Sequence, residues 1–126
     1  MKTASLKKIL LTFANALKVD YITSEGAESG FYWRKWKSGT IEAWGIKTFS
    51  STAGTAWGNM YYYNFSVAIP SGIFPEKPIR GYATSTGDLQ WMVAGVYIAS
   101  ATSCTVRLAK PVSSSQAGGV YIYLYY

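Results

Sequence analysis

From Gly30 to the C-terminus the side chains alternate with a period of two, which is the periodicity of β-strands. The pattern is clearest over residues 120–126 (Val-Tyr-Ile-Tyr-Leu-Tyr-Tyr), where aliphatic residues should face a core and tyrosines the opposite side. Short strands separated by turns of Gly, Pro and Ser predict an all-β, antiparallel β-sandwich of about six to eight strands. The expected strands are residues 30–37, 40–49, 57–69, 79–86, 89–99, 103–109 and 120–126.

The first two of these strands should form a hairpin around Ser38-Gly39, because Gly accepts the positive φ that a tight turn requires. Arg34 and Glu42 are expected to pair across this hairpin, since opposite charges on neighbouring strands attract. That pairing is a simpler account of Glu42 than a catalytic role.

Before the β region, residues 5–18 predict a helix with Ser5 as its N-cap. Apolar residues recur at steps of 4, 3 and 4, which is the spacing of a heptad seam. The seam residues are Leu6, Leu10, Phe13 and Leu17. A helix this short is marginal alone in water, so it needs a partner. Self-association is favoured, and packing on the chain's own β domain is the alternative.

The chain therefore divides into an oligomerisation stem (1–18), a polar connector (19–29) and a β-sandwich (30–126). The apolar residues 9–14, followed by Ala14-Asn15-Ala16 as a small-x-small cleavage site, superficially resemble a signal peptide. The apolar run is short, however, and is broken by Thr12. No segment is long and apolar enough to predict membrane insertion.

Aromatic residues make up 17% of the chain, with 11 Tyr and 5 Trp, which is more than one small core can bury. Some should therefore lie at a subunit interface or a binding surface. The tyrosines of residues 120–126 fit an interface or stacking within one monomer. Trp57, Tyr82 and Trp91 adjoin loops and are the candidates for stacking on a glycan, with core or interface packing as the alternative.

Several function classes lack the residues they need. The formal net charge is +6, but the β region has no Lys/Arg stripe, so nucleic acid is not an expected partner. With no His, no Ser-His-Asp triad can exist, and with one Cys a zinc site has too few of its usual ligands, so no metal or other cofactor is expected. Cys104 should be a buried strand residue. We therefore expect no catalytic residues and no enzymatic activity.

Residues 30–45 carry a resemblance to a known family. They read as an aromatic-Tyr-Trp-Arg-Lys-Trp strand, a Ser-Gly turn, and an acidic residue two positions before Trp44-Gly45. This segment resembles one in the C-terminal domains of tailed-phage and prophage tail-fibre or baseplate proteins. The leader at residues 14–22 and the junction at residues 67–78 (Val-Ala-Ile-Pro, then Ile-Phe-Pro-Glu-Lys-Pro) are similar to theirs as well.

The resemblance implies a small lectin-like sandwich that trimerises about a helical stem at the end of a tail appendage. Its partners would be copies of itself, other tail or baseplate proteins and, if it is an adhesin, a bacterial cell-surface glycan. Such a prophage-encoded protein is made in the bacterial cytoplasm and lies in the virion tail, outside the cell once assembled. The chain is shorter than those proteins, so a fragment or a stand-alone remnant is expected. The other reading is a secreted, stand-alone carbohydrate-binding module, monomeric or dimeric.

Overall fold

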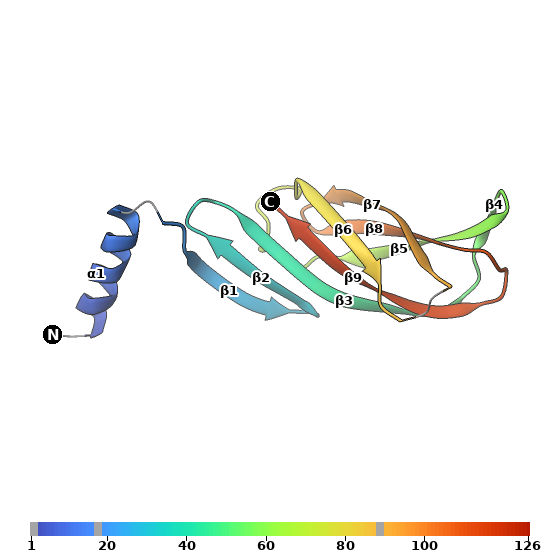
Figure 1. Ribbon diagram of the computed structural model, residues 1–126, viewed down its shortest axis with the longest axis horizontal. Coiled ribbons are helices and arrows are strands. Elements are labelled where there is room, and N and C mark those ends of the chain that lie inside the picture. Colours follow the sequence, from blue (N-terminus) through green and yellow to red (C-terminus); the bar gives the residue numbers. More distant parts are fainter. Residues whose placement is uncertain (1–2, 17–18, 88–89) are drawn as a thin grey trace.

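The computed structural model describes residues 3–16, 19–87 and 90–126, and Figure 1 shows how their elements are arranged. Within these ranges the chain forms one helix, α1 (Thr3–Ala16), and nine strands. The strands are β1 (Ile22–Glu28), β2 (Phe31–Trp36), β3 (Ile41–Thr52), β4 (Thr55–Trp57), β5 (Met60–Ala68), β6 (Arg80–Ser85), β7 (Met92–Ser100), β8 (Ser103–Lys110) and β9 (Gln116–Tyr125).

The strands form two antiparallel sheets that pack as a sandwich, which confirms the predicted all-β fold. One sheet has the order β1-β2-β3-β9-β6 and the other β4-β5-β8-β7. The longest pairing, between β3 and β9, joins the middle of the chain to its C-terminal strand. The first predicted hairpin is present, and Gly39 has a φ of 97° in its turn.

The core lies between the sheets and follows the predicted alternation. In β9 the aliphatic residues Val120, Ile122 and Leu124 are fully buried. Facing them from the other sheet, β8 buries Cys104, Val106 and Leu108. Burial of the whole aliphatic set on both inner faces fixes the strand register, because a slip of one residue would expose it.

Two strands lie where the sequence predicted a connector and part of a longer strand. Residues 19–29 were expected to be a connector, but Ile22–Glu28 forms β1 and pairs with β2, so the sandwich begins there. The expected strand 57–69 is also divided. A turn at Gly58, with a φ of 60°, separates β4 from β5 and makes them a hairpin. Both β1 and β4 are edge strands with mostly exposed side chains, so they lack the alternation that marks a half-buried strand.

Helix α1 lies apart from the sandwich, beyond the end that carries β1 and β2 (Figure 1). It begins at Thr3, so Ser5 lies inside the helix and is not its N-cap. Its seam residues Leu10 and Phe13 are 60% and 62% exposed, and Leu6 is exposed as well, whereas Leu17 lies outside the described residues. The alternative that the helix packs on its own domain is therefore wrong. No helix among the described residues is long and apolar enough to cross a membrane.

Candidate binding surfaces

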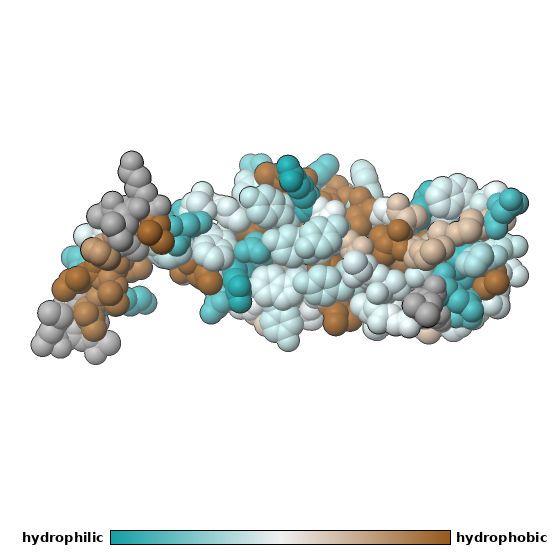
Figure 2. Space-filling view, in the orientation of Figure 1, coloured by the Kyte–Doolittle hydropathy of each residue, from teal (hydrophilic) through white to brown (hydrophobic). Residues whose placement is uncertain are grey.

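The outer face of the five-stranded sheet carries a row of aromatic rings. Tyr32, Trp44, Tyr123 and Tyr82 are direct cross-strand neighbours on β2, β3, β9 and β6. Tyr82 stacks on Tyr123 with ring centroids 5.0 Å apart, and Tyr32 stacks on Trp44 at 6.3 Å. Tyr32 and Tyr82 remain 56% and 57% exposed. With Ile46, Tyr121 and Tyr125, these four residues form what is here called the aromatic face, and Figure 2 shows ring-shaped side chains gathered over β3, β9 and β6.

A half-buried carboxylate orders the centre of this face. Glu42 on β3 accepts hydrogen bonds from Trp36 Nε1 at 2.8 Å and from the Tyr123 hydroxyl at 2.7 Å. Burial, and next the hydrogen bond to Glu42, raise the pKa of Tyr123 above its usual range. Each carboxylate oxygen of Glu42 thus accepts one of these bonds, and the pair of bonds helps to hold the two rings in place.

The predicted ion pair between Arg34 and Glu42 does not form. The two residues are cross-strand partners, but the Arg34 guanidinium pairs with Glu25 on β1, with Nε 3.7 Å from Oε2. It also lies 5.2 Å from the centre of the Trp44 ring. The physical reason is that Glu42 already binds Trp36 and Tyr123, while β1, which the sequence did not predict, brings a second carboxylate to Arg34.

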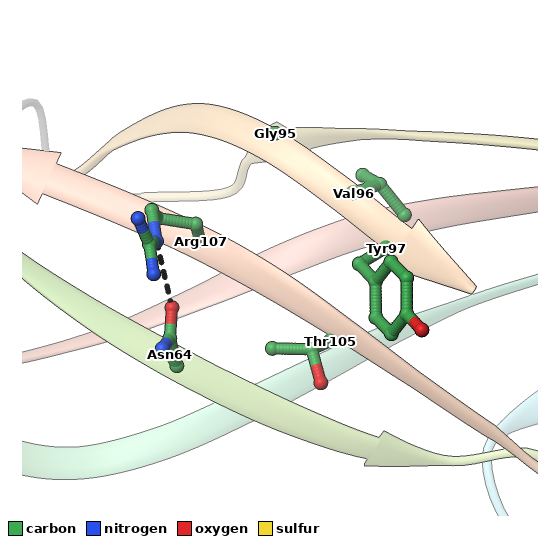
Figure 3. Close-up of a pocket in the computed structure, with 6 residues that line it drawn as sticks. All are labelled: Asn64, Gly95, Val96, Tyr97, Thr105 and Arg107. Carbon is green, nitrogen blue, oxygen red and sulfur yellow. Dashed lines mark hydrogen bonds between the residues drawn. The ribbon is translucent and has the colours of Figure 1, made fainter. Parts of the chain in front are cut away.

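The outer face of the four-stranded sheet has a different character. An open slot of about 450 Å³ lies on it, formed by β5, β7 and β8 (Figure 3). This region, here called the Arg107 slot, is lined by Asn64, Gly95, Val96, Tyr97, Thr105 and Arg107. In Figure 3 Arg107 reaches toward Asn64, and Thr105 lies between this pair and Tyr97.

The Arg107 guanidinium is held in a fixed position. Its Nε donates to Asn64 Oδ1 at 2.9 Å. Its central carbon lies 4.4 Å from the centre of the Tyr62 ring and 5.4 Å from that of Trp57. Such cation–π contacts are favourable and restrict the long side chain. In the part of the chain that the structure describes, no carboxylate forms an ion pair with Arg107.

The structure separates the three predicted ligand-binding aromatics. Trp57 is exposed beside Arg107, and Tyr82 is exposed on the aromatic face of the opposite sheet. Trp91 is only 1% exposed, so the prediction that its ring offers a face to a glycan is corrected. It precedes β7 and turns inward, where it packs edge-on against Phe49 and donates to the Gln116 carbonyl at 3.3 Å.

Arg107 is the residue that the sequence reasoning missed. Its position between Val106 and Leu108 does place it on the outer side of β8. Its surroundings, however, depend on the pairing of Asn64 with Arg107 across β5 and β8, which local sequence does not reveal.

Among the described residues, no three His, Cys, Asp or Glu side chains lie close enough to hold a metal ion. Cys104 is fully buried, and this burial raises the pKa of its thiol to about 11. The thiol is therefore protonated and sheltered at neutral pH. The chemistry that the two outer faces offer is ring stacking, hydrogen bonding and a fixed positive charge.

No protein-family model matches the sequence, and no curated protein matches it either. Two solved structures are similar in fold. The first is an N-truncated R1-type pyocin tail fibre, with 14% identity, a TM-score of 0.61 and coverage of 92% of this chain and 94% of that one. The second is the C-terminal part of a P. aeruginosa R1 pyocin fibre, with 14% identity and a TM-score of 0.51. It matches 90% of this chain, which spans 30% of that longer one. The chain thus has the fold of pyocin tail fibre domains, in agreement with the tail-fibre resemblance of its sequence.

Proposed function

We propose that this chain is a tail-fibre tip domain that assembles as a homotrimer and binds a bacterial cell surface, without enzymatic activity. The fold similarity to pyocin tail fibres supports the placement of this domain in a tail fibre. The observation that carries the proposal is the amount of apolar and aromatic surface that one copy of the chain leaves uncovered, on α1 and on the aromatic face. Monomeric proteins rarely expose such contiguous patches without a partner.

The stem is the first part of the proposed interface. Leu6, Leu10 and Phe13 recur at heptad spacing and are all exposed in the single chain. Three copies of the helix would bury these side chains against one another and set a three-fold axis. Because the helix lies beyond the end of the sandwich, such a bundle would form without displacing any strand.

The aromatic face is the second part. Its tyrosines and Trp44 are residue types enriched in the centres of interfaces, since they bury large areas with few rotamers lost. A tyrosine hydroxyl can also satisfy its hydrogen bond when covered, as Tyr123 already does with Glu42. With this face covered by neighbouring copies, the outer face of the four-stranded sheet would point away from the axis, toward a cell-surface glycan. Other tail or baseplate proteins would bind toward the stem.

Light scattering of the full chain tests the assembly. The expected mass is three times the 13.8 kDa of one chain. Deletion of residues 1–18, or Leu10→Gln, should shift the mass toward the monomer. Lys8→Gln is the matched control, because Lys8 lies on the helix side away from the seam. A monomer at micromolar concentration contradicts the trimer and favours the stand-alone carbohydrate-binding module.

An array of bacterial surface glycans tests the second half of the proposal. Binding to a defined group of glycans is the expected result. A trimer that binds no glycan would leave the chain a structural tip alone.

A further inference from the structure

The Arg107 slot has three features that together describe a ligand. It holds an oriented positive charge at one end, an exposed aromatic ring at the other, and a hydroxyl between them. Its volume of about 450 Å³ is within the range of small-molecule sites, about 300–1,000 Å³. Arg107 and Thr105 come from β8, Tyr97 from β7 and Asn64 from β5, so the register of these three strands builds the site.

The charge is available to a ligand. Asn64 occupies the Nε of Arg107, and the rings of Tyr62 and Trp57 fix the guanidinium from the side. The two terminal nitrogens form the fork that matches a carboxylate or a phosphate with paired hydrogen bonds. Because the guanidinium is oriented before any ligand arrives, less conformational entropy is lost on binding.

The space beside the charge comes from a glycine. Gly95 on β7 is the cross-strand partner of Arg107, and a Cβ built on Gly95 meets no atom within 4 Å. The missing side chain leaves the floor of the slot open next to the guanidinium. Two residues further along β7, Tyr97 is 67% exposed and lies opposite Thr105. A sugar ring has apolar C–H faces that stack on such an aromatic ring and hydroxyls that can bond to Thr105.

We propose that the Arg107 slot binds an anionic saccharide, which is a sugar ring carrying a carboxylate or a phosphate group. The anionic group lies on the Arg107 guanidinium, and the ring lies against Tyr97 with Thr105 in hydrogen-bonding reach. This inference rests on the proposed receptor-binding role and names the ligand class of the outward face. The positive net charge of the chain, +6, also favours association with an anionic surface.

Titration of the full chain with four probes tests the ligand class by NMR chemical shifts. The probes are glucuronic acid, glucose 6-phosphate, glucose and inorganic phosphate. We expect at least one of the two anionic sugars to bind saturably and about tenfold or more tightly than glucose, since hydrogen bonds to charged groups contribute about 1.5–3 kcal/mol. Inorganic phosphate should bind more weakly than that sugar because it cannot reach Tyr97. The anionic sugar that binds more tightly shows whether the slot prefers a carboxylate or a phosphate group. The proposal is overturned if glucose binds as tightly as the anionic sugars, or if neither anionic sugar binds.

Variants test the location. Gly95→Leu should fill part of the slot, since a Cβ at this position meets no atom within 4 Å, and Arg107→Gln should remove the charge. Each should weaken binding of the anionic sugar about tenfold or more. Lys77→Gln is the control, because it removes one exposed positive charge far along the chain from the slot. If the Arg107→Gln protein does not fold, Gly95→Leu still tests whether the sugar binds in the slot. Unchanged binding of the anionic sugar to a folded Gly95→Leu protein overturns the proposed site.

The two proposals fail in different ways. A trimer that binds glucose as well as glucuronic acid would overturn the anionic slot and leave the trimeric tip standing. A monomer that binds glucuronic acid through Arg107 would overturn the trimeric tip and support the slot.

Discussion

The Tyr123 hydroxyl donates a 2.7 Å hydrogen bond to Glu42 and so ties β9 to β3 through their side chains at the centre of the aromatic face. The two residues are 81 positions apart in sequence. Trp36 donates to the other oxygen of the same carboxylate. One glutamate therefore positions two rings, and the aromatic face is ordered before any partner covers it.

Tyr123→Phe should lower the free energy of unfolding by about 1–2 kcal/mol, because it removes a hydrogen bond to a half-buried carboxylate. Urea denaturation at a fixed protein concentration measures the change. Tyr121→Phe is the matched control, since Tyr121 lies on the same strand and face but forms no hydrogen bond through its hydroxyl within the described chain. Equal losses in the two variants would contradict the role of Glu42.

The same contact predicts a dependence on alkaline pH. The folded-state pKa of Tyr123 is raised, first by burial and then by Glu42, so folding favours the neutral phenol. Its contribution to stability is fully present below the ordinary tyrosine pKa of about 10 and is lost as the pH rises above it. Tyr123→Phe should therefore lose less stability than the wild type between neutral and strongly alkaline pH. A titration of tyrosinate absorbance should show, in the wild type, a phenol that ionises above the ordinary tyrosine range and that is missing from Tyr123→Phe. Identical absorbance changes of the two proteins above the ordinary tyrosine range would contradict this account.

Cys104 provides a probe of the core. Its thiol is buried between the sheets, and burial raises its pKa to about 11. A thiol-alkylating reagent at pH 8 should therefore modify the native protein slowly and the urea-unfolded protein fast, because the thiolate is the reactive form. Mass spectrometry over time measures both rates. Fast modification of the native protein would show that the two sheets open readily at this position.

The sequence predicted those parts of the fold whose side chains alternate in burial. Strand β8 from Cys104 to Leu108 and strand β9 from Val120 to Leu124 bury every second residue, so their periodicity was visible without any structure. Strands β1 and β4 lie at sheet edges with mostly exposed side chains, and backbone pairing rather than side-chain burial defines them. An edge strand of this kind leaves no periodic signal.

The binding surfaces were less predictable, because they depend on register between distant strands. Tyr82 and Trp57 are candidates in the sequence because they adjoin loops, but nothing local indicates that they are exposed or that they lie on opposite sheets. The contact of Arg107 with Asn64 joins residues 43 positions apart. In the sequence Trp91 is equivalent to Trp57, since both adjoin turns. Only the three-dimensional structure shows that Trp91 is buried and Trp57 is exposed.

That difference between two tryptophans gives a direct test of the assignment. Trp91→Ala should cost about 3–5 kcal/mol of unfolding free energy, because it leaves a cavity among Phe49, Tyr63 and the Lys110 side chain, whose Nζ lies 4.4 Å from the ring centre. Trp57→Ala should cost about 1 kcal/mol or less, because Trp57 is exposed and its removal loses only an edge-on ring contact with Tyr62 and a cation–π contact with Arg107. Urea denaturation of both variants measures these costs. The reverse order would place Trp57 in the core and Trp91 at a surface, and would return Trp91 to the set of glycan-stacking residues.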